Sequence, residues 1–168
     1  MSEPLEIERK FLIRFPAPEI LERYASGQSE IEQSYLRARP GTTLRVRKRV
    51  TDGVPAYYRT EKRKRSHMTR VELETELTEA EYLRLLDDAE PGLRTIRKRR
   101  YLIPWEGRVF EMDLFPFWTD RAFLEIELES EDAVFTLPPF LTVLKEVTED
   151  RRYTNRALAE NIPMDAIE

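Results

Sequence analysis

Polar and apolar side chains alternate along the first stretch of the chain, residues 5–13. Glu6, Glu8 and Lys10 share one face of the extended backbone and the opposite face is mostly apolar, which predicts a β-strand. Two carboxylates two residues apart on a strand point the same way and are close enough to hold a hard cation between them. Exposed faces of antiparallel strands also carry Glu and Lys, so this strand alone does not separate a binding site from a solvated surface.

The same alternation recurs along the chain and predicts about eight strands in all. After the first, strands are expected at residues 30–39, 43–50, 56–64, 70–77, 94–103, 109–115 and 121–129. The turn pairs Pro40-Gly41, Asp52-Gly53 and Glu106-Gly107 separate several of them. Helices are expected over residues 17–25, after Thr78, and from residue 150 or 151 to 160.

Short antiparallel strands joined by tight turns favour a closed or nearly closed barrel, because closure removes the edges that eight strands would otherwise expose. At 168 residues the chain is most simply one domain, large enough for a core of its own. The predicted fold is therefore mainly β, in the α+β class. It is an eight-stranded antiparallel closed β-barrel with a few packing helices, in a single domain over residues 1–168.

Composition limits the chemistry. Charged residues make up 36% of the chain, with 28 Lys and Arg against 32 Asp and Glu, so the net charge of −4 conceals two large opposed populations. The absence of Cys excludes thiolate sites, and a single histidine, His67, excludes sites that need two imidazoles, so any metal must be held by oxygen. No apolar run approaches membrane-spanning length and no signal peptide begins the chain. We therefore expect a cytoplasmic protein with no membrane partner.

The polar faces of the predicted strands carry rows of one sign of charge. Basic rows are Arg45, Arg47 and Arg49, and Lys98 and Arg100; acidic rows are Glu6 and Glu8, Glu72, Glu74 and Glu76, Glu111 and Asp113, and Glu125 and Glu127. Gathered into one enclosed space, such rows are costly to desolvate unless they are compensated. A polyanion that carries a divalent metal suits both populations. Arg and Lys would bind phosphate oxygens, and the carboxylates would hold Mg²⁺ or Mn²⁺.

Other interpretations of the rows are open on pattern alone. They could form cross-strand ion pairs on a solvated outer surface. The basic strands could suit a nucleic acid, but the acidic rows and acidic balance would repel a phosphate backbone, so no nucleic-acid partner is expected. The chain has no Gly-rich phosphate loop, so phosphate contacts would come from side chains. His67 is expected to be incidental, and the inward face of residues 56–64 and 94–103 is ambiguous.

The stretch Glu6-Ile7-Glu8-Arg9-Lys10-Phe11 resembles the ExExK signature that opens the CYTH superfamily, also called the triphosphate tunnel metalloenzymes. The resemblance continues in order through Gln33 with Tyr35, Leu44-Arg45-Val46-Arg47, Lys62, Arg70 with Glu72 and Glu74, Lys98 to Tyr101, Glu111 with Asp113, Glu125-Ile126-Glu127-Leu128, and Glu146-Val147-Thr148 leading to Tyr153 and Asn155. It implies an eight-stranded antiparallel tunnel with charged side chains inside, bordered or plugged at one mouth by the C-terminal helix.

By position, the resemblance assigns roles to individual residues. The metal ligands would be Glu6, Glu8, Asp113, Glu125 and Glu127. The substrate-binding residues would be Lys10, Arg45, Arg47, Lys62, Lys98 and Arg100. The catalytic residues would be Glu6, Glu8, Lys10 and Lys98. Further acidic tunnel residues would be Glu72, Glu74 and Glu111.

The resemblance also implies an activity. Family members cleave triphosphate compounds with Mg²⁺ or Mn²⁺, and the chain is most similar to bacterial inorganic triphosphatases. We therefore expect a metal-dependent hydrolase that converts inorganic triphosphate, a small molecule, to pyrophosphate and phosphate. The alternatives are a class IV adenylyl cyclase, a thiamine triphosphatase, or a non-catalytic module that binds polyphosphate or nucleotides. A homodimer stays open.

Overall fold

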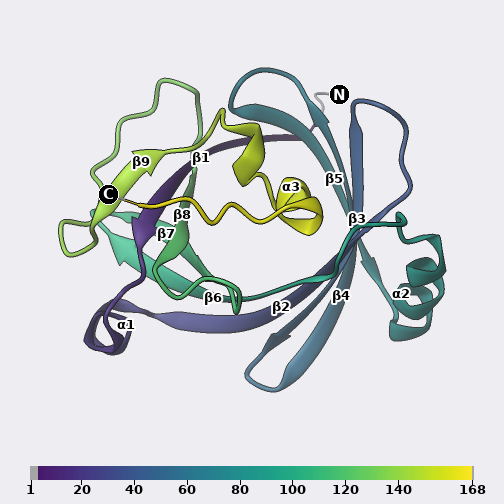
Figure 1. The fold of residues 1–168 in the computed structure, drawn as a ribbon, viewed down its shortest axis with the longest axis horizontal. Helices are drawn as coiled ribbons and strands as arrows, with labels where there is room; N and C mark the ends of the chain where they lie inside the picture. Colours follow the sequence, from purple (N-terminus) through teal and green to yellow (C-terminus); the bar gives the residue numbers. More distant parts are fainter. Residues whose placement is uncertain (1–3, 168) are drawn as a thin grey trace.

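The computed structural model describes residues 4–167, in which nine β-strands form one sheet (Figure 1). The strands are β1 (Leu5–Arg14), β2 (Gly27–Leu36), β3 (Thr42–Thr51), β4 (Val54–Lys64), β5 (Thr69–Leu77), β6 (Ile96–Trp105), β7 (Arg108–Leu114), β8 (Arg121–Glu127) and β9 (Val143–Glu146). The helices are α1 (Pro18–Tyr24), α2 (Glu79–Leu85), α3 (Asn155–Glu160) and the 3₁₀ turns η1 (Leu86–Asp88) and η2 (Arg151–Tyr153).

Eight of the strands close into an antiparallel barrel, which confirms the predicted fold. The order is β5-β4-β3-β2-β6-β7-β8-β1, and β1 pairs with β5 to complete the ring. The closing seam is short, because only Leu5 to Ile7 of β1 face Thr69 to Val71 of β5. Further along, the same edge of β1 pairs with β9, where Phe11 lies opposite Glu146. One strand thus joins the barrel to the C-terminal part of the chain.

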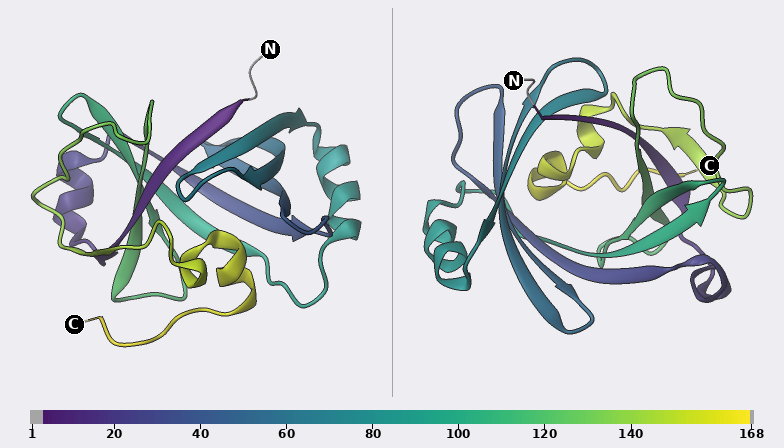
Figure 2. Two further views of the ribbon diagram at one scale, coloured as in Figure 1. Left: turned by 90° about the horizontal axis from the view of Figure 1, so that it is seen from above. Right: turned by 180° about the vertical axis from the view of Figure 1, so that it is seen from behind.

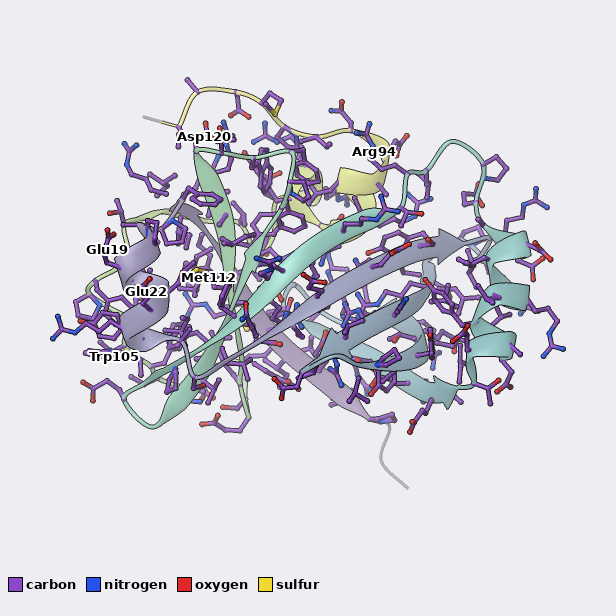
Figure 3. All side chains as sticks on the ribbon, turned by 90° about the horizontal axis from the view of Figure 1, so that it is seen from below. Glu19, Glu22, Arg94, Trp105, Met112 and Asp120 are labelled. Carbon is purple, nitrogen blue, oxygen red and sulfur yellow. The ribbon has the colours of Figure 1, made fainter. Side chains whose placement is uncertain are left out.

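The outer wall of β1, β6, β7 and β8 carries the larger apolar core. Its buried members include Ile13, Ile103, Phe110, Met112, Leu124 and Ile126. Ile20 and Leu21 of α1 pack on this surface, beside Trp105 of β6 (Figure 3). Glu19 and Glu22 lie on the exposed side of α1. On the far side of the barrel, α2 packs Tyr82 against Leu36 and Val46.

A second apolar cluster closes one end of the barrel from inside. It includes Leu12, Tyr35, Ile96, Phe115, Trp118, Phe123, Tyr153 and Leu158. Leu12 and Phe123 continue the inward rows of β1 and β8, and η2 and α3 contribute Tyr153 and Leu158. In Figure 1, α3 lies across the opening that the strands enclose, and Figure 2 places the C-terminal segment at one end of the barrel. The charged part of the interior is therefore confined to the remainder of the tunnel.

Several predicted boundaries shift by a few residues. The strand expected at residues 30–39 spans Gly27–Leu36, and the Arg37 N–H instead donates to the Asp88 carbonyl. The strand expected at 94–103 spans Ile96–Trp105, because the Arg94 N–H bonds to Ala159 outside the sheet. The expected helix start at Thr78 is confirmed as a capping box with Glu81. None of the helices in residues 4–167 has the length and apolar character needed to cross a bilayer.

Candidate active site

A cavity of about 500 Å³ opens inside the barrel, between β1, the β2–β3 turn and the segment that follows β9. Five of the predicted site residues line it: Glu6, Glu8, Lys10, Arg45 and Lys62. Further cations at its margin are Arg39, Lys64, Arg70 and Arg156, and the one further carboxylate of its lining is Glu90. Although the whole chain is acidic, the lining carries an excess of cations. The cavity is therefore suited to an anion.

Lys10, which lines this cavity, forms an ion pair with Glu125, which is not part of the lining. The two residues are paired across β1 and β8, and Lys10 Nζ lies 3.3 Å from Glu125 Oε1. Lys10 Nζ also donates to the Tyr153 carbonyl at 3.2 Å. Burial alone would raise the pKa of Glu125, but Lys10 and Arg100 hold that pKa at about 2. Glu125 is therefore ionised at neutral pH.

Among the predicted metal ligands, Glu8 and Glu127 form no ion pair within residues 4–167, unlike Glu6, Asp113 and Glu125. Glu6 accepts a hydrogen bond from Lys62 Nζ at 2.9 Å. Burial, followed by the charges of Glu125 and Glu6, raises the pKa of Glu8 to about 8. Burial also raises the pKa of Glu6 and of Glu127, which lies opposite Glu8 on β8. A cation bound among these carboxylates would offset their repulsion.

The donor set fits a hard divalent cation in kind but is not preassembled. Glu6, Glu8, Glu125 and Glu127 supply only oxygen, which Mg²⁺ and similar ions prefer. Across residues 4–167, however, no three acidic side chains converge in a geometry that would hold a metal ion. Binding would require side-chain rotation, and Glu127, which is exposed at the barrel rim, has room for it.

Lys98, Arg100 and Asp113 form a separate network deeper in the wall. Lys98 Nζ lies 2.8 Å from Asp113 Oδ2, and neither side chain is exposed. Arg100 donates to both oxygens of Asp113 at 2.8 and 2.9 Å, and its Nη1 lies 2.7 Å from Glu111. Burial would raise the pKa of Asp113, but Arg100 and Lys98 hold that pKa well below its usual range. Asp113 is thus engaged by two cations and does not line the cavity of Glu6 and Glu8.

Three interior cations, Lys98, Arg47 and Arg45, either have a pKa lowered by burial or lack a hydrogen-bond acceptor for one buried atom within residues 4–167. Burial lowers the pKa of Lys98 to about 7, although Asp113 opposes this effect. Burial, together with Arg45 and Arg100, lowers the pKa of Arg47 to about 9. Arg47 donates to the neutral Gln33 Oε1 at 2.9 and 3.2 Å, and the buried Nε of Arg45 has no hydrogen-bond partner within residues 4–167. Bound phosphate oxygens would supply the missing acceptors.

The acidic row of β5 reaches the site only in part. Glu72 Oε2 lies 3.8 Å from Lys62 Nζ, so it joins the Lys62 and Glu6 pair. Glu74 is exposed, accepts a hydrogen bond from Thr60 at 3.3 Å and does not line the cavity. The face of β4 that the alternation left ambiguous is settled by its register, because Lys62 pairs with Glu72 and Thr60 with Glu74.

Three contacts of the site were not predicted from the sequence. Gln33 bonds Arg47, and its place beside Tyr35 on one strand face was the available signal. Thr148 accepts from the Lys10 backbone N–H at 3.0 Å. The third contact is the Tyr153 carbonyl on Lys10 Nζ. A backbone oxygen carries no sequence signature, so it could be found only from the folded chain.

Comparison with known proteins identifies the family. The sequence model of the CYTH domain matches residues 4–149. An inorganic triphosphatase of Nitrosomonas europaea is 36% identical over 165 residues, which covers 94% of this chain and 99% of that protein. A crystal structure of the inorganic triphosphatase NE1496 matches with a TM-score of 0.59 and 33% identity, over 94% of this chain and 96% of that one.

A more distant structure, of the protein PH1819 from Pyrococcus horikoshii OT3, matches with a TM-score of 0.56 and 20% identity, over 76% of this chain and 80% of that one. At that identity the match concerns the fold alone. The family match and the match to the Nitrosomonas relative each extend over most of the chain. The chain belongs to the CYTH domain family.

Proposed function

We propose that this chain hydrolyses inorganic triphosphate to pyrophosphate and phosphate, with Mg²⁺ or Mn²⁺ as cofactor. The observation that carries the proposal is one cavity lined by both Arg45, whose buried Nε has no hydrogen-bond partner within residues 4–167, and Glu8, a carboxylate whose pKa is raised by burial and by its acidic neighbours. A polyanion with a bound divalent cation compensates both groups at once. The similarity to an inorganic triphosphatase over nearly the full length supports the same substrate.

The cations of the interior bind and neutralise the substrate in this proposal. Lys10, Arg45 and Lys62 line the cavity and would contact phosphate oxygens directly. Arg47, Lys98 and Arg100 lie deeper and would complete the positive field around the terminal phosphoryl group. Phosphoryl transfer spreads charge over its equatorial oxygens, so fixed cations in a site shielded from water stabilise the transition state.

The carboxylates would hold the metal and the attacking water. Glu6, Glu8, Glu125 and Glu127 are the proposed metal ligands, and the metal, when bound, would polarise phosphoryl oxygens and offset their charge. Burial raises the pKa of Glu8 to about 8 in the metal-free protein, so a metal that binds there would displace a proton from this carboxyl. Asp113 lies between Lys98 and Arg100, so we propose that it orients these cations. Its sequence-based role as a metal ligand stays a prediction.

The test is phosphate release from inorganic triphosphate, ATP and thiamine triphosphate, each with Mg²⁺, Mn²⁺ or a chelator. We expect fast release from inorganic triphosphate only with metal, and a loss of at least about 100-fold in Glu8→Gln. Glu129→Gln is the matched control, because Glu129 is exposed, follows β8 and pairs with Arg108 outside the cavity. Cyclic AMP and pyrophosphate formed from ATP, or tight binding of triphosphate without turnover, would overturn the proposal.

A further inference from the structure

Lys10 is held by the segment that follows β9. Its backbone N–H donates to Thr148 Oγ1 at 3.0 Å and its carbonyl accepts from the Val147 N–H at 2.8 Å. Its ammonium donates to the Tyr153 carbonyl at 3.2 Å. Residues 147–153 therefore contact both the backbone and the charged end of a residue that lines the cavity.

These contacts occur where the barrel seam opens. The pairing of β1 with β5 ends at Ile7, and the Glu8 N–H makes one further bond, to the Met68 carbonyl at 3.0 Å. The edge groups of Lys10 then have no partner on β5, and buried backbone groups left unpaired are costly. Thr148 and Val147 supply the partners, so the C-terminal segment takes over the role of a neighbouring strand at this position.

Thr148 is itself oriented for this contact. Its hydroxyl donates to Glu146 Oε2 at 2.6 Å, and Glu146 accepts two hydrogen bonds from Arg9 at 2.6 and 2.9 Å. Because the hydroxyl hydrogen is used by Glu146, the oxygen presents a lone pair to the Lys10 N–H. The side chain of residue 148 thus acts as a fixed acceptor.

Tyr153 fixes the ammonium by a different route. Its ring is 1% exposed and lies 6.0 Å from Phe123 and 6.2 Å from Trp118, between ring centroids, in the aromatic cluster that closes the barrel. Its N–H donates to the Asp150 carbonyl at 3.1 Å. The anchored ring and this turn determine where the Tyr153 carbonyl lies. Lys10 Nζ is shared between that carbonyl and Glu125, 4.6 Å from the centre of the Phe123 ring.

We propose that Thr148 and Tyr153 are positioning residues for Lys10, which set where its ammonium meets the bound phosphate. Tyr153 lies beyond residue 149, where the match to the family model ends, so part of the site is built by a segment outside that match. The catalytic consequence rests on the proposed triphosphatase activity. The placement of the Lys10 ammonium is independent of that activity, and it can be measured without substrate.

The catalytic test is a double-mutant cycle with Lys10→Met. Thr148→Val removes the acceptor and keeps the shape of the side chain, and Thr148→Ser keeps the acceptor. We expect Thr148→Val to lower kcat/KM for inorganic triphosphate about tenfold, and Thr148→Ser to restore it. In the Lys10→Met background the same change should have little further effect, because coupled residues are not additive. An equal loss in both backgrounds would mean that Thr148 acts elsewhere and would overturn the proposal.

The test without substrate is NMR of the lysine ammonium groups, with the Lys10 signal assigned by its loss in Lys10→Arg. We expect the signal to shift in Thr148→Val and in Tyr153→Ala, and to stay in place in Thr148→Ser and in Glu160→Gln on the exposed side of α3. Thermal melting confirms that each variant is folded, and Thr148→Val alone decides the result if Tyr153→Ala unfolds. An unmoved Lys10 signal in folded Thr148→Val refutes the inference, even if the wild-type protein hydrolyses triphosphate.

Discussion

Glu8 and Glu127 lie directly opposite each other on β1 and β8. Like charges in directly opposed positions of an antiparallel pair destabilise the sheet, and burial strengthens the effect for Glu8. The next pair on the same face of these two strands is the oppositely charged Lys10 and Glu125. The barrel thus carries an unfavourable pair beside a favourable one, at the position where the proposed metal would bind.

This pair predicts how stability depends on pH. The pKa of Glu8 is raised from 4.5 to about 8 in the folded protein, so between these values the folded state binds more protons than the unfolded state. The contribution of Glu8 to stability is therefore fully present below about pH 4.5 and is lost as the pH rises toward about 8. We expect the melting temperature of the metal-free protein to fall less steeply over this window in Glu8→Gln than in the wild type.

Added divalent metal should reverse the trend, because metal ligands must be deprotonated and metal competes with the proton on Glu8. We expect Mg²⁺ or Mn²⁺ to raise the melting temperature more at pH 8 than at pH 6, and this gain to be lost in Glu8→Gln. Glu129→Gln, which changes an exposed carboxylate paired with Arg108, should behave like the wild type. An equal gain at both pH values would show that Glu8 is not a ligand.

Substitution of Arg45 should lower activity without lowering stability. Its buried Nε has no hydrogen-bond partner within residues 4–167, and its charge lowers the pKa of Arg47. Replacing a buried, poorly compensated charge with an apolar side chain is often neutral or stabilising. We expect Arg45→Met to lower kcat/KM for triphosphate about 100-fold, with no loss in the free energy of unfolding measured by urea titration. The control is Arg97→Met, which changes an exposed cation on β6.

Substitution of Asp113, unlike that of Arg45, should lower the stability of the protein. Asp113 is the acceptor for both Lys98 and Arg100 and has no exposed surface. Asp113→Asn keeps the size of the side chain but leaves two buried cations without their carboxylate. We expect a loss of about 3–5 kcal/mol in the free energy of unfolding. A loss within the scatter of surface variants such as Glu129→Gln would show that the network is not important for stability.

The alternation of polar and apolar residues predicted the closed barrel and most of the inward residues. On a strand with one apolar face, this pattern indicates which side chains lie on each side of the sheet. On β1 and β8 the apolar face is buried under α1 and the loop before β9, so Lys10 and Glu125 could be assigned inward from sequence. On β4 both faces are polar, and only the register with β5 places Lys62 inside. Local pattern fixes a face only when the two faces differ in polarity.

Other features depend on contacts that a linear pattern does not contain. The rows of β1 and β8 change from charged to apolar at Leu12 and Phe123, but the cluster that closes the tunnel there also needs Tyr153 from the C-terminal segment. Asp113 shares its face with Glu111, and the family resemblance assigned it to the metal ligands, which stays a prediction. The register places it opposite Phe123 on β8 and Arg100 on β6. These strands are consecutive in the sequence, but the register that sets the two pairings is defined only in the folded sheet.

The last prediction concerns the pH dependence of substrate binding. Burial lowers the pKa of Lys98 to about 7, so in the free protein this side chain is charged below neutrality and largely neutral above it. A triphosphate anion binds the charged form more tightly, and binding must therefore weaken as the pH rises through 7.

Lys98→Arg keeps a positive charge throughout this range. We expect the Kd of the metal-free wild type for inorganic triphosphate to rise about tenfold from pH 6.5 to 8.5, and the Kd of Lys98→Arg to rise clearly less, as measured by calorimetry. Titration of the anion itself is common to both proteins, so the difference between their profiles isolates Lys98. Identical profiles would show that Lys98 does not bind phosphate and that its role is limited to the ion pair with Asp113.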